Sequence, residues 1–170
     1  MIKKEMIQAL NNQLNKEFHS AYIYLGMSAY ASANGFNGCA KWFNLQYQEE
    51  IVHAMKLFRY LEEQNANIKL KDIKALNVKS DSIVEVFKSA YKHEQKMTKA
   101  LNNLSDLAMK QKDHATYSLL QWYINEQVEE EALFNEIIDK LEMVGNDGYG
   151  LYSIDQELGS RVFVDPTTKA

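Results

Sequence analysis

The chain has 170 residues, 46% of them hydrophobic, which suffices for one well-buried domain over residues 1–170 and is rather small for two. Its 19 Lys and Arg residues against 23 Asp and Glu residues give a formal net charge of -4, which argues against a nucleic-acid binder, since those normally show a clustered basic excess. The single cysteine, Cys39, excludes an internal disulfide framework and any four-cysteine zinc or iron–sulfur site.

The apolar residues are not arranged for a membrane or for export. The first eighteen residues contain no apolar core of signal-peptide length. Nowhere does an apolar run approach the ~18–20 residues of a membrane span. We therefore expect a cytoplasmic protein with no membrane partner.

The first half of the chain predicts two long amphipathic helices when residues are placed ~100° apart around an axis. The first ends at the stop signal Ala33-Asn34-Gly35, and its apolar stripe consists of Met6, Ile7, Leu10, Leu14, Phe18, Ala21, Tyr24 and Leu25. A short turn over 34–39 follows, so the second helix runs antiparallel to the first. Its stripe consists of Phe43, Tyr47, Ile51, Ala54, Leu57, Phe58 and Leu61.

The second half predicts two more helices of similar length. The third begins after the capping residues Ser80-Asp81-Ser82, with a stripe of Ile83, Phe87, Ala90, Tyr91, Met97, Leu101 and Leu104. The fourth opens near Asp113 after another short turn and stops at Gly145-Asn146, with a stripe of Leu119, Leu120, Tyr123, Phe134, Ile137, Ile138 and Leu141.

The connection over residues 67–80 is long and contains neither glycine nor proline. Extended at ~3.3 Å per residue, it can run back along the whole length of a helix bundle, so that the second and third helices run parallel. After the fourth helix, Leu151, Ile154 and Leu158 suit a short fifth helix. The sequence therefore predicts an all-α protein, a four-helix bundle with a long crossover and a short C-terminal helix.

One acid interrupts the apolar stripe of each long helix. These acids are Glu17, Glu50, Glu94 and Glu130. A single acid at the edge of a stripe often reaches water, but burying four unpaired carboxylates would cost more than an ordinary domain's stability. None of the four stripes offers a Lys or Arg to neutralise them. Because all four lie near mid-helix, they should meet at mid-height in the bundle, where a bound multivalent cation would compensate them.

His53 follows Glu50 by three residues, so both side chains lie on one helix face and can bind one ion. Carboxylates with one imidazole suit iron or manganese better than copper(I) or structural zinc. Four glutamates and one histidine fit two ions: one bound by Glu17, Glu50 and His53, the other by Glu50, Glu94 and Glu130, with Gln127 as a polar neighbour. We expect the other histidines, His19, His93 and His114, to be exposed to solvent.

Three segments, LNKEFHSAYIYLGMSAY, FNLQYQEEIVHAMKLF and INEQVEEEALFNEI, are similar to the metal-binding segments of bacterial non-haem ferritins. The resemblance runs essentially end to end. It implies a ferritin-like bundle, assembled as a hollow homo-oligomeric shell of 24 subunits. In such a shell, Fe(II) is oxidised by O₂ or H₂O₂ at a dinuclear ferroxidase centre and stored as ferric oxyhydroxide.

The resemblance implies residue roles as well. It places the ferroxidase ligands on Glu17, Glu50, His53, Glu94 and Glu130, with Gln127 beside them. It also implies a third iron position on Glu49, Glu126, Glu129 and Glu130, although Glu49 and Glu129 lie off the apolar stripes and ordinary solvated acids are the alternative. Tyr24 matches a tyrosine that hydrogen-bonds at the centre or donates an electron; an aromatic core residue is the alternative.

The sequence departs from neighbouring families at defined positions. Bacterioferritins have a second Glu-x-x-His on the fourth helix and a haem-ligating methionine directly after the second-helix glutamate, where this chain has Gln127-Val-Glu-Glu130 and Ile51. We therefore predict no haem. Rubrerythrins add a four-cysteine iron domain, which Cys39 alone does not provide.

Two other classes of function are also compatible with the sequence. One is a monomeric or dimeric di-iron or di-manganese enzyme acting on an organic substrate or peroxide, which would elute as a small species. The other is a purely structural bundle, which would bind no iron and would gain stability when its buried acids were replaced.

Overall fold

Four long helices and one short helix make up most of the computed structural model, which describes residues 2–74 and 78–168. The helices are α1 (Lys4–Ala33), α2 (Asn37–Glu63), α3 (Ile83–Gln111), α4 (His114–Val144) and α5 (Gly148–Gly159), followed by one 3-10 turn, η1 (Pro166–Thr168). The predicted all-α fold with a short fifth helix is confirmed. Among the described residues, no helix is long and apolar enough to cross a membrane.

The helix ends follow the capping residues that the sequence predicts. The Ser82 side chain accepts a hydrogen bond from the Glu85 backbone N–H at the start of α3, and Asp113 accepts one from Thr116 at the start of α4. At the end of α4, Gly145 adopts a positive φ of 54°, a backbone conformation that glycine tolerates best. The caps therefore fix the start of α3 and both ends of α4.

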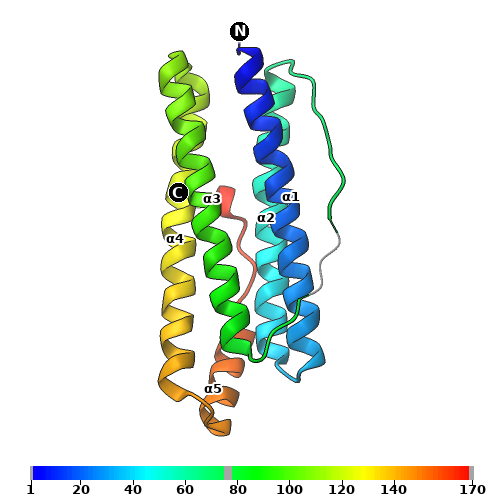
Figure 1. Ribbon diagram of the computed structural model, residues 1–170, viewed down its shortest axis with the longest axis vertical. Coiled ribbons are helices and arrows are strands. Elements are labelled where there is room, and N and C mark those ends of the chain that lie inside the picture. The colour runs from blue at the N-terminus through cyan, green and yellow to red at the C-terminus, as the bar shows by residue number, and fades with distance from the viewer. Residues whose placement is uncertain (1, 75–77, 169–170) are drawn as a thin grey trace.

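The long crossover lies along the outside of the bundle and makes α2 and α3 parallel (Figure 1). Its first half is bound to α1 by two asparagines. Asn11 Oδ1 accepts from the Lys69 backbone N–H at 2.6 Å, and Asn15 Oδ1 accepts from that of Lys71 at 2.7 Å. Residues 75–77 of the predicted crossover lie outside the described residues.

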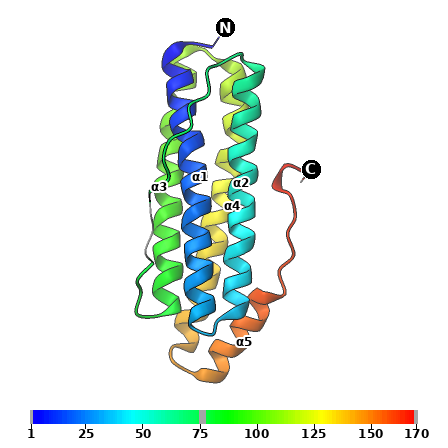
Figure 2. The same ribbon diagram turned by 90° about the vertical axis from the view of Figure 1, so that its right-hand side faces the viewer.

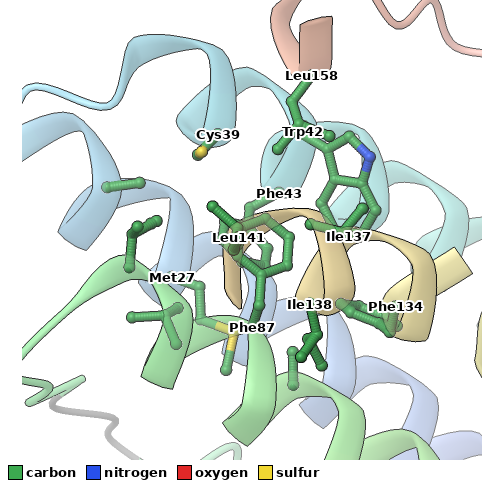
Figure 3. Close-up of a cluster of buried hydrophobic side chains, with 14 of the residues drawn as sticks. Met27, Cys39, Trp42, Phe43, Phe87, Phe134, Ile137, Ile138, Leu141 and Leu158 are labelled. Atoms are coloured by element: carbon green, nitrogen blue, oxygen red, sulfur yellow. The ribbon is translucent and has the colours of Figure 1, made fainter. Parts of the chain in front are cut away.

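The hydrophobic core consists of two clusters stacked along the bundle. The cluster nearer α5 is rich in aromatic residues, including Trp42, Phe43, Phe87 and Phe134 (Figure 3). The other is largely aliphatic and includes Leu10, Leu14, Leu57, Leu61, Leu101 and Tyr123. On every long helix the predicted core acid falls between residues of the two clusters, so a polar layer separates them. Leu25, which we expected in the core, is 40% exposed and its assignment is wrong.

Helix α5 packs across the start of α2 through an acid and a glycine. The Asp155 carboxylate accepts hydrogen bonds from the backbone N–H groups of Gly38 and Cys39 at 2.9 and 2.8 Å, which caps α2 from another element. A Cβ atom on Gly38 would lie 1.6 Å from the Asp155 carbonyl oxygen. The absence of a side chain at position 38 thus permits this close contact.

The substitution Gly38→Ala is expected to lower the free energy of unfolding by about 1–3 kcal/mol, the usual cost of forcing extra atoms into a packed interface. Gly148→Ala is the control, because Gly148 lies at the start of the same helix α5 and nothing lies within 4 Å of a Cβ at that position. Urea denaturation of both variants measures the difference. Equal stabilities for the two variants would contradict the close contact.

Candidate metal centre

The four core acids lie in the polar layer between the two hydrophobic clusters, one on each long helix. The exposed fractions of Glu17, Glu50, Glu94 and Glu130 are 2%, 2%, 1% and 6%. Within residues 2–74 and 78–168, no lysine or arginine forms an ion pair with any of these four. The predicted convergence of buried acids without an ion-paired lysine or arginine at mid-height is therefore present.

Glu17, Glu50 and His53 form the tightest group of this layer. Each offers one ligand atom, and these atoms all lie within 4.8 Å of one another. His53 Nδ1 lies 3.7 Å from Glu50 Oε2, as expected for residues three apart on one helix face. Glu50 Oε2 and His53 Nε2 are buried and have no hydrogen-bond partner. A buried oxygen and a buried nitrogen without partners, in one group of possible ligands, fit a site for a cation.

Three glutamine side chains orient the carboxylates of the layer. Gln127 Nε2 donates to Glu94 Oε2 at 3.0 Å, which fits its predicted place beside the centre. Gln13 donates to Glu17 at 2.8 Å and Gln46 to Glu130 at 2.8 Å; the sequence analysis missed both. For Gln13 the signal was available, because it precedes Glu17 by four residues, one helical turn; Gln46 binds an acid of another helix, which no local spacing indicates.

Tyr24 is both buried in the aromatic core and hydrogen-bonded at the centre, the two contacts that the sequence offered as alternatives. Its ring is fully buried between Phe43 and Phe134, with ring centroids 6.3 and 6.1 Å away. Its hydroxyl donates a short hydrogen bond to Glu94. Tyr24 is therefore an aromatic core residue whose polar end contacts a core acid.

Burial raises the pKa of Glu17, Glu50 and Glu130 well above the ordinary glutamate value, and neighbouring carboxylates raise it further. Burial also raises the pKa of Glu94, although the hydrogen bonds from Tyr24 and Gln127 act in the opposite direction. Without a cation these acids therefore retain protons more readily than exposed ones. A cation that binds must displace those protons, so its affinity rises with pH.

Of the acids implied for a third iron position, Glu49 and Glu126 lie beside the centre, and the acids differ in exposure. Glu49 and Glu126 are 8% and 7% exposed, and Glu126 Oε2 lies 4.0 Å from His53 Nε2. Glu129 is exposed. Glu49 is not a solvated acid, because both of its oxygens accept hydrogen bonds from Arg161 Nη2, at 2.9 and 2.8 Å. No sequence pattern points to Arg161, since it follows α5 in a segment without helical periodicity.

The remaining histidines differ from the expectation of full exposure. Only His114 is exposed; His19 is half-buried. His93 forms a 2.7 Å hydrogen bond with the Ser20 hydroxyl, and burial, together with His19 and Lys96, lowers its pKa to about 4. The prediction was wrong for His19 and His93, because α1 and α3 pack closely enough to cover positions that lie off the apolar stripes.

The donor set of the layer suits hard, oxygen-preferring metal ions. Four carboxylates and one imidazole converge from four helices, with no thiolate among them. Glutamines fix three of the carboxylates, and Tyr123 donates a 2.7 Å hydrogen bond to the His53 backbone oxygen, which secures the helix turn that carries the imidazole. Such outer contacts hold metal ligands in position.

Comparisons with known proteins agree with this geometry. The model of the ferritin-like domain family matches residues 7–144. A bacterial non-haem ferritin of Campylobacter jejuni is 40% identical, covering 92% of this chain and 93% of its own, and one of Escherichia coli is 42% identical, covering 94% and 97%. An open-pore ferritin from the archaeon Archaeoglobus fulgidus superposes with a TM-score of 0.94 at 41% identity, covering 95% of this chain and all of its own. The buried acids, the crossover and these similarities together establish that the chain belongs to the ferritin family, alongside the bacterial non-haem ferritins.

Proposed function

We propose that this protein stores iron and that its polar layer is a ferroxidase centre, which oxidises Fe(II) before the iron is deposited as ferric oxyhydroxide. Iron storage follows from membership of the ferritin family. The observation that carries the ferroxidase proposal is the buried group of Glu17, Glu50 and His53 with its unpartnered oxygen and nitrogen atoms. Iron is here the substrate and the stored product.

Two Fe(II) ions would share Glu50. One would bind Glu17, Glu50 and His53, and the other Glu50, Glu94 and Glu130, with Gln127 holding Glu94. The position of Glu50 supports this assignment, since its charge interacts with those of Glu17, Glu94 and Glu130. The second ion would lack an imidazole ligand, so the two ions should differ in affinity.

The proposed reaction uses one electron from each Fe(II). With O₂ as oxidant, two Fe(II) become two Fe(III) while O₂ takes up two electrons and two protons to give H₂O₂. With H₂O₂ as oxidant, the same two electrons and two protons give two molecules of water. Each Fe(III) then hydrolyses with two water molecules to FeO(OH), releasing three protons. Carboxylate ligands favour the oxidation step because hard oxygen ligands stabilise Fe(III) over Fe(II).

Storage of a mineral requires an enclosed space, and a single bundle provides none. The proposal therefore includes a homo-oligomeric shell of 24 subunits in the cytoplasm, without haem at the Ile51 position. The third iron position on Glu49, Glu126, Glu129 and Glu130 stays a prediction. The end-to-end similarity to ferritins supports the shell.

Size-exclusion chromatography before and after aerobic addition of Fe(II) tests the proposed function. A 24-subunit shell of this 19.6 kDa chain elutes near half a megadalton, and the added iron should co-elute with it as a soluble ferric species. A monomer or dimer that retains about two metal ions per chain would instead support a di-iron or di-manganese enzyme.

The substitution Tyr24→Phe is expected to slow Fe(II) oxidation about 10-fold while leaving the shell intact. It keeps the buried ring and removes only the hydroxyl that donates to Glu94, an outer contact of the kind whose loss typically costs 10–100-fold in metal affinity or activity. Stopped-flow absorbance of ferric products measures the rate. The matched control is Tyr117→Phe, a half-buried tyrosine that packs on the aliphatic cluster. An unchanged rate in Tyr24→Phe would remove Tyr24 from the centre.

A further inference from the structure

Arg161 places a positive charge beside the metal centre from outside the four-helix bundle. It follows α5 directly, and its Nη2 atom donates to both carboxylate oxygens of Glu49 at 2.9 and 2.8 Å. The side chains of Arg161 and Glu49 are 23% and 10% exposed. Its guanidinium also lies 5.0 Å from the ring centroid of Trp42. Several contacts thus hold this arginine in one position.

Gln46 connects Arg161 to the centre. Arg161 Nη1 donates a short hydrogen bond to Gln46 Oε1, and Gln46 Nε2 donates to Glu130 Oε2 at 2.8 Å. Because the guanidinium contains only donors, it fixes the amide of Gln46 with its oxygen outward and its NH₂ group toward Glu130. Arg161 therefore acts on Glu49 directly and on Glu130 through one fully buried side chain.

The charges of these groups interact with the centre. The Glu49 carboxylate raises the pKa of both Glu50 and Glu130, while Arg161 lowers that of Glu130. The guanidinium consequently compensates part of the negative charge on this side of the layer. A metal ion bound to Glu49 would perform the same compensation.

We propose that Arg161 is a tethered cation that competes with a metal ion for Glu49. The guanidinium already occupies both oxygens of this carboxylate, so an ion at the position formed by Glu49, Glu126, Glu129 and Glu130 has to displace it. This inference rests on the proposed function, because it concerns iron next to the ferroxidase centre. It makes Arg161 a residue that sets metal affinity at that position.

The segment that carries Arg161 is suited to displacement. Residues 161–168 run back along the outside of α2 as an extended segment without regular secondary structure, which ends in the 3-10 turn η1 (Figure 2). Val162 and Val164 are 74% and 55% exposed, and Pro166 alone is buried in this stretch. Releasing the arginine therefore requires no change in the packing of the long helices. Binding of a further ion should therefore be coupled to release of this segment.

The test is anaerobic isothermal titration calorimetry of Zn(II), a redox-inert probe, into the iron-free assembled protein. We compare the wild type with Arg161→Gln and with the double variant Arg161→Gln, Glu49→Gln. We expect Arg161→Gln to bind one further Zn(II) per chain at least about 10-fold more tightly than the wild type, and the double variant to lose this gain. Lys41→Gln is the matched control, because Lys41 also contacts the end of α5, at the Gly159 oxygen, but touches no acid of the layer.

Equal affinity for the further ion in wild type and Arg161→Gln would overturn the inference, as would a gain that persists without Glu49. If Arg161→Gln does not assemble, displacement of Arg161 is tested in the single variant Trp122→Phe, which keeps Arg161 and in which Trp42 is the only tryptophan. Zn(II) beyond the first two ions should then change the Trp42 fluorescence, and a constant signal would contradict displacement. Failure of the proposed centre is distinguishable, because in that case the first two tight ions are absent too, and failure of the proposed shell is seen separately by size-exclusion chromatography.

Discussion

The double variant Glu50→Ala, His53→Ala is expected to oxidise Fe(II) at least about 100-fold more slowly than the wild type, close to the rate of Fe(II) in buffer alone. Loss of an outer contact to a metal ligand already costs about 10–100-fold, and this variant loses the shared carboxylate and the only imidazole. Anaerobic mixing of protein with Fe(II), followed by addition of O₂, measures the initial rate by absorbance.

The matched control is Glu62→Ala, Glu63→Ala, which removes two exposed acids near the end of the same helix. It should retain the wild-type rate. Circular dichroism and size-exclusion chromatography establish that both variants fold and assemble. Rapid oxidation by the Glu50, His53 variant would show that the catalytic iron binds elsewhere and would refute the proposed centre.

Replacing three of the buried acids is expected to stabilise the metal-free protein at high pH. Burial raises the pKa of Glu17, Glu50 and Glu130, so the folded state binds more protons than the unfolded state. Stability therefore falls as pH rises above the ordinary glutamate value of about 4.5, through the raised folded values. The variant Glu17→Gln, Glu50→Gln, Glu130→Gln avoids this loss of stability at pH 8. Its free energy of unfolding should therefore exceed that of the wild type by more than about 1.4 kcal/mol, which corresponds to a shift of one pKa unit.

Denaturation in the presence of a chelator at pH 5 and pH 8 measures this effect. The wild type should lose stability between the two values, while the glutamine variant should change much less. Adding Zn(II) at pH 8 should restore the wild type but not the variant, because only the wild type has ligands for it. A wild type whose stability rises from pH 5 to pH 8 without metal would contradict the raised pKa values.

The sequence alone predicts the helices and the layer of acids, because these features are periodic, and it predicts the helix directions from the lengths of the connections. An acid in each apolar stripe, at the same height in four helices, is visible on a helical wheel. Ser82, Asp113 and Gly145 likewise mark helix ends through local chemistry. The pairing of Glu50 with His53 follows from the same spacing rule.

Apart from the local pair of Gln13 and Glu17, the features that could not be read from the sequence depend on contacts between distant segments. Arg161 reaches Glu49 across 112 positions of chain, and Asp155 reaches Gly38 across 117. His93 is covered because α1 presents Ser20 to it, which no pattern within α3 indicates. Gln46 lies one turn before Glu50, but its role becomes clear only when Glu130 and Arg161 are in place. Tertiary contacts, rather than periodicity, decide these cases.

The most direct test of the two-ion centre is crystallographic. Crystals soaked anaerobically with Fe(II) and measured on both sides of the iron absorption edge report the metal positions. We predict two anomalous peaks in each subunit, one within bonding distance of Glu17, Glu50 and His53 and one within bonding distance of Glu50, Glu94 and Glu130. Peaks that leave Glu50 and His53 without a metal contact would contradict the proposed ferroxidase centre.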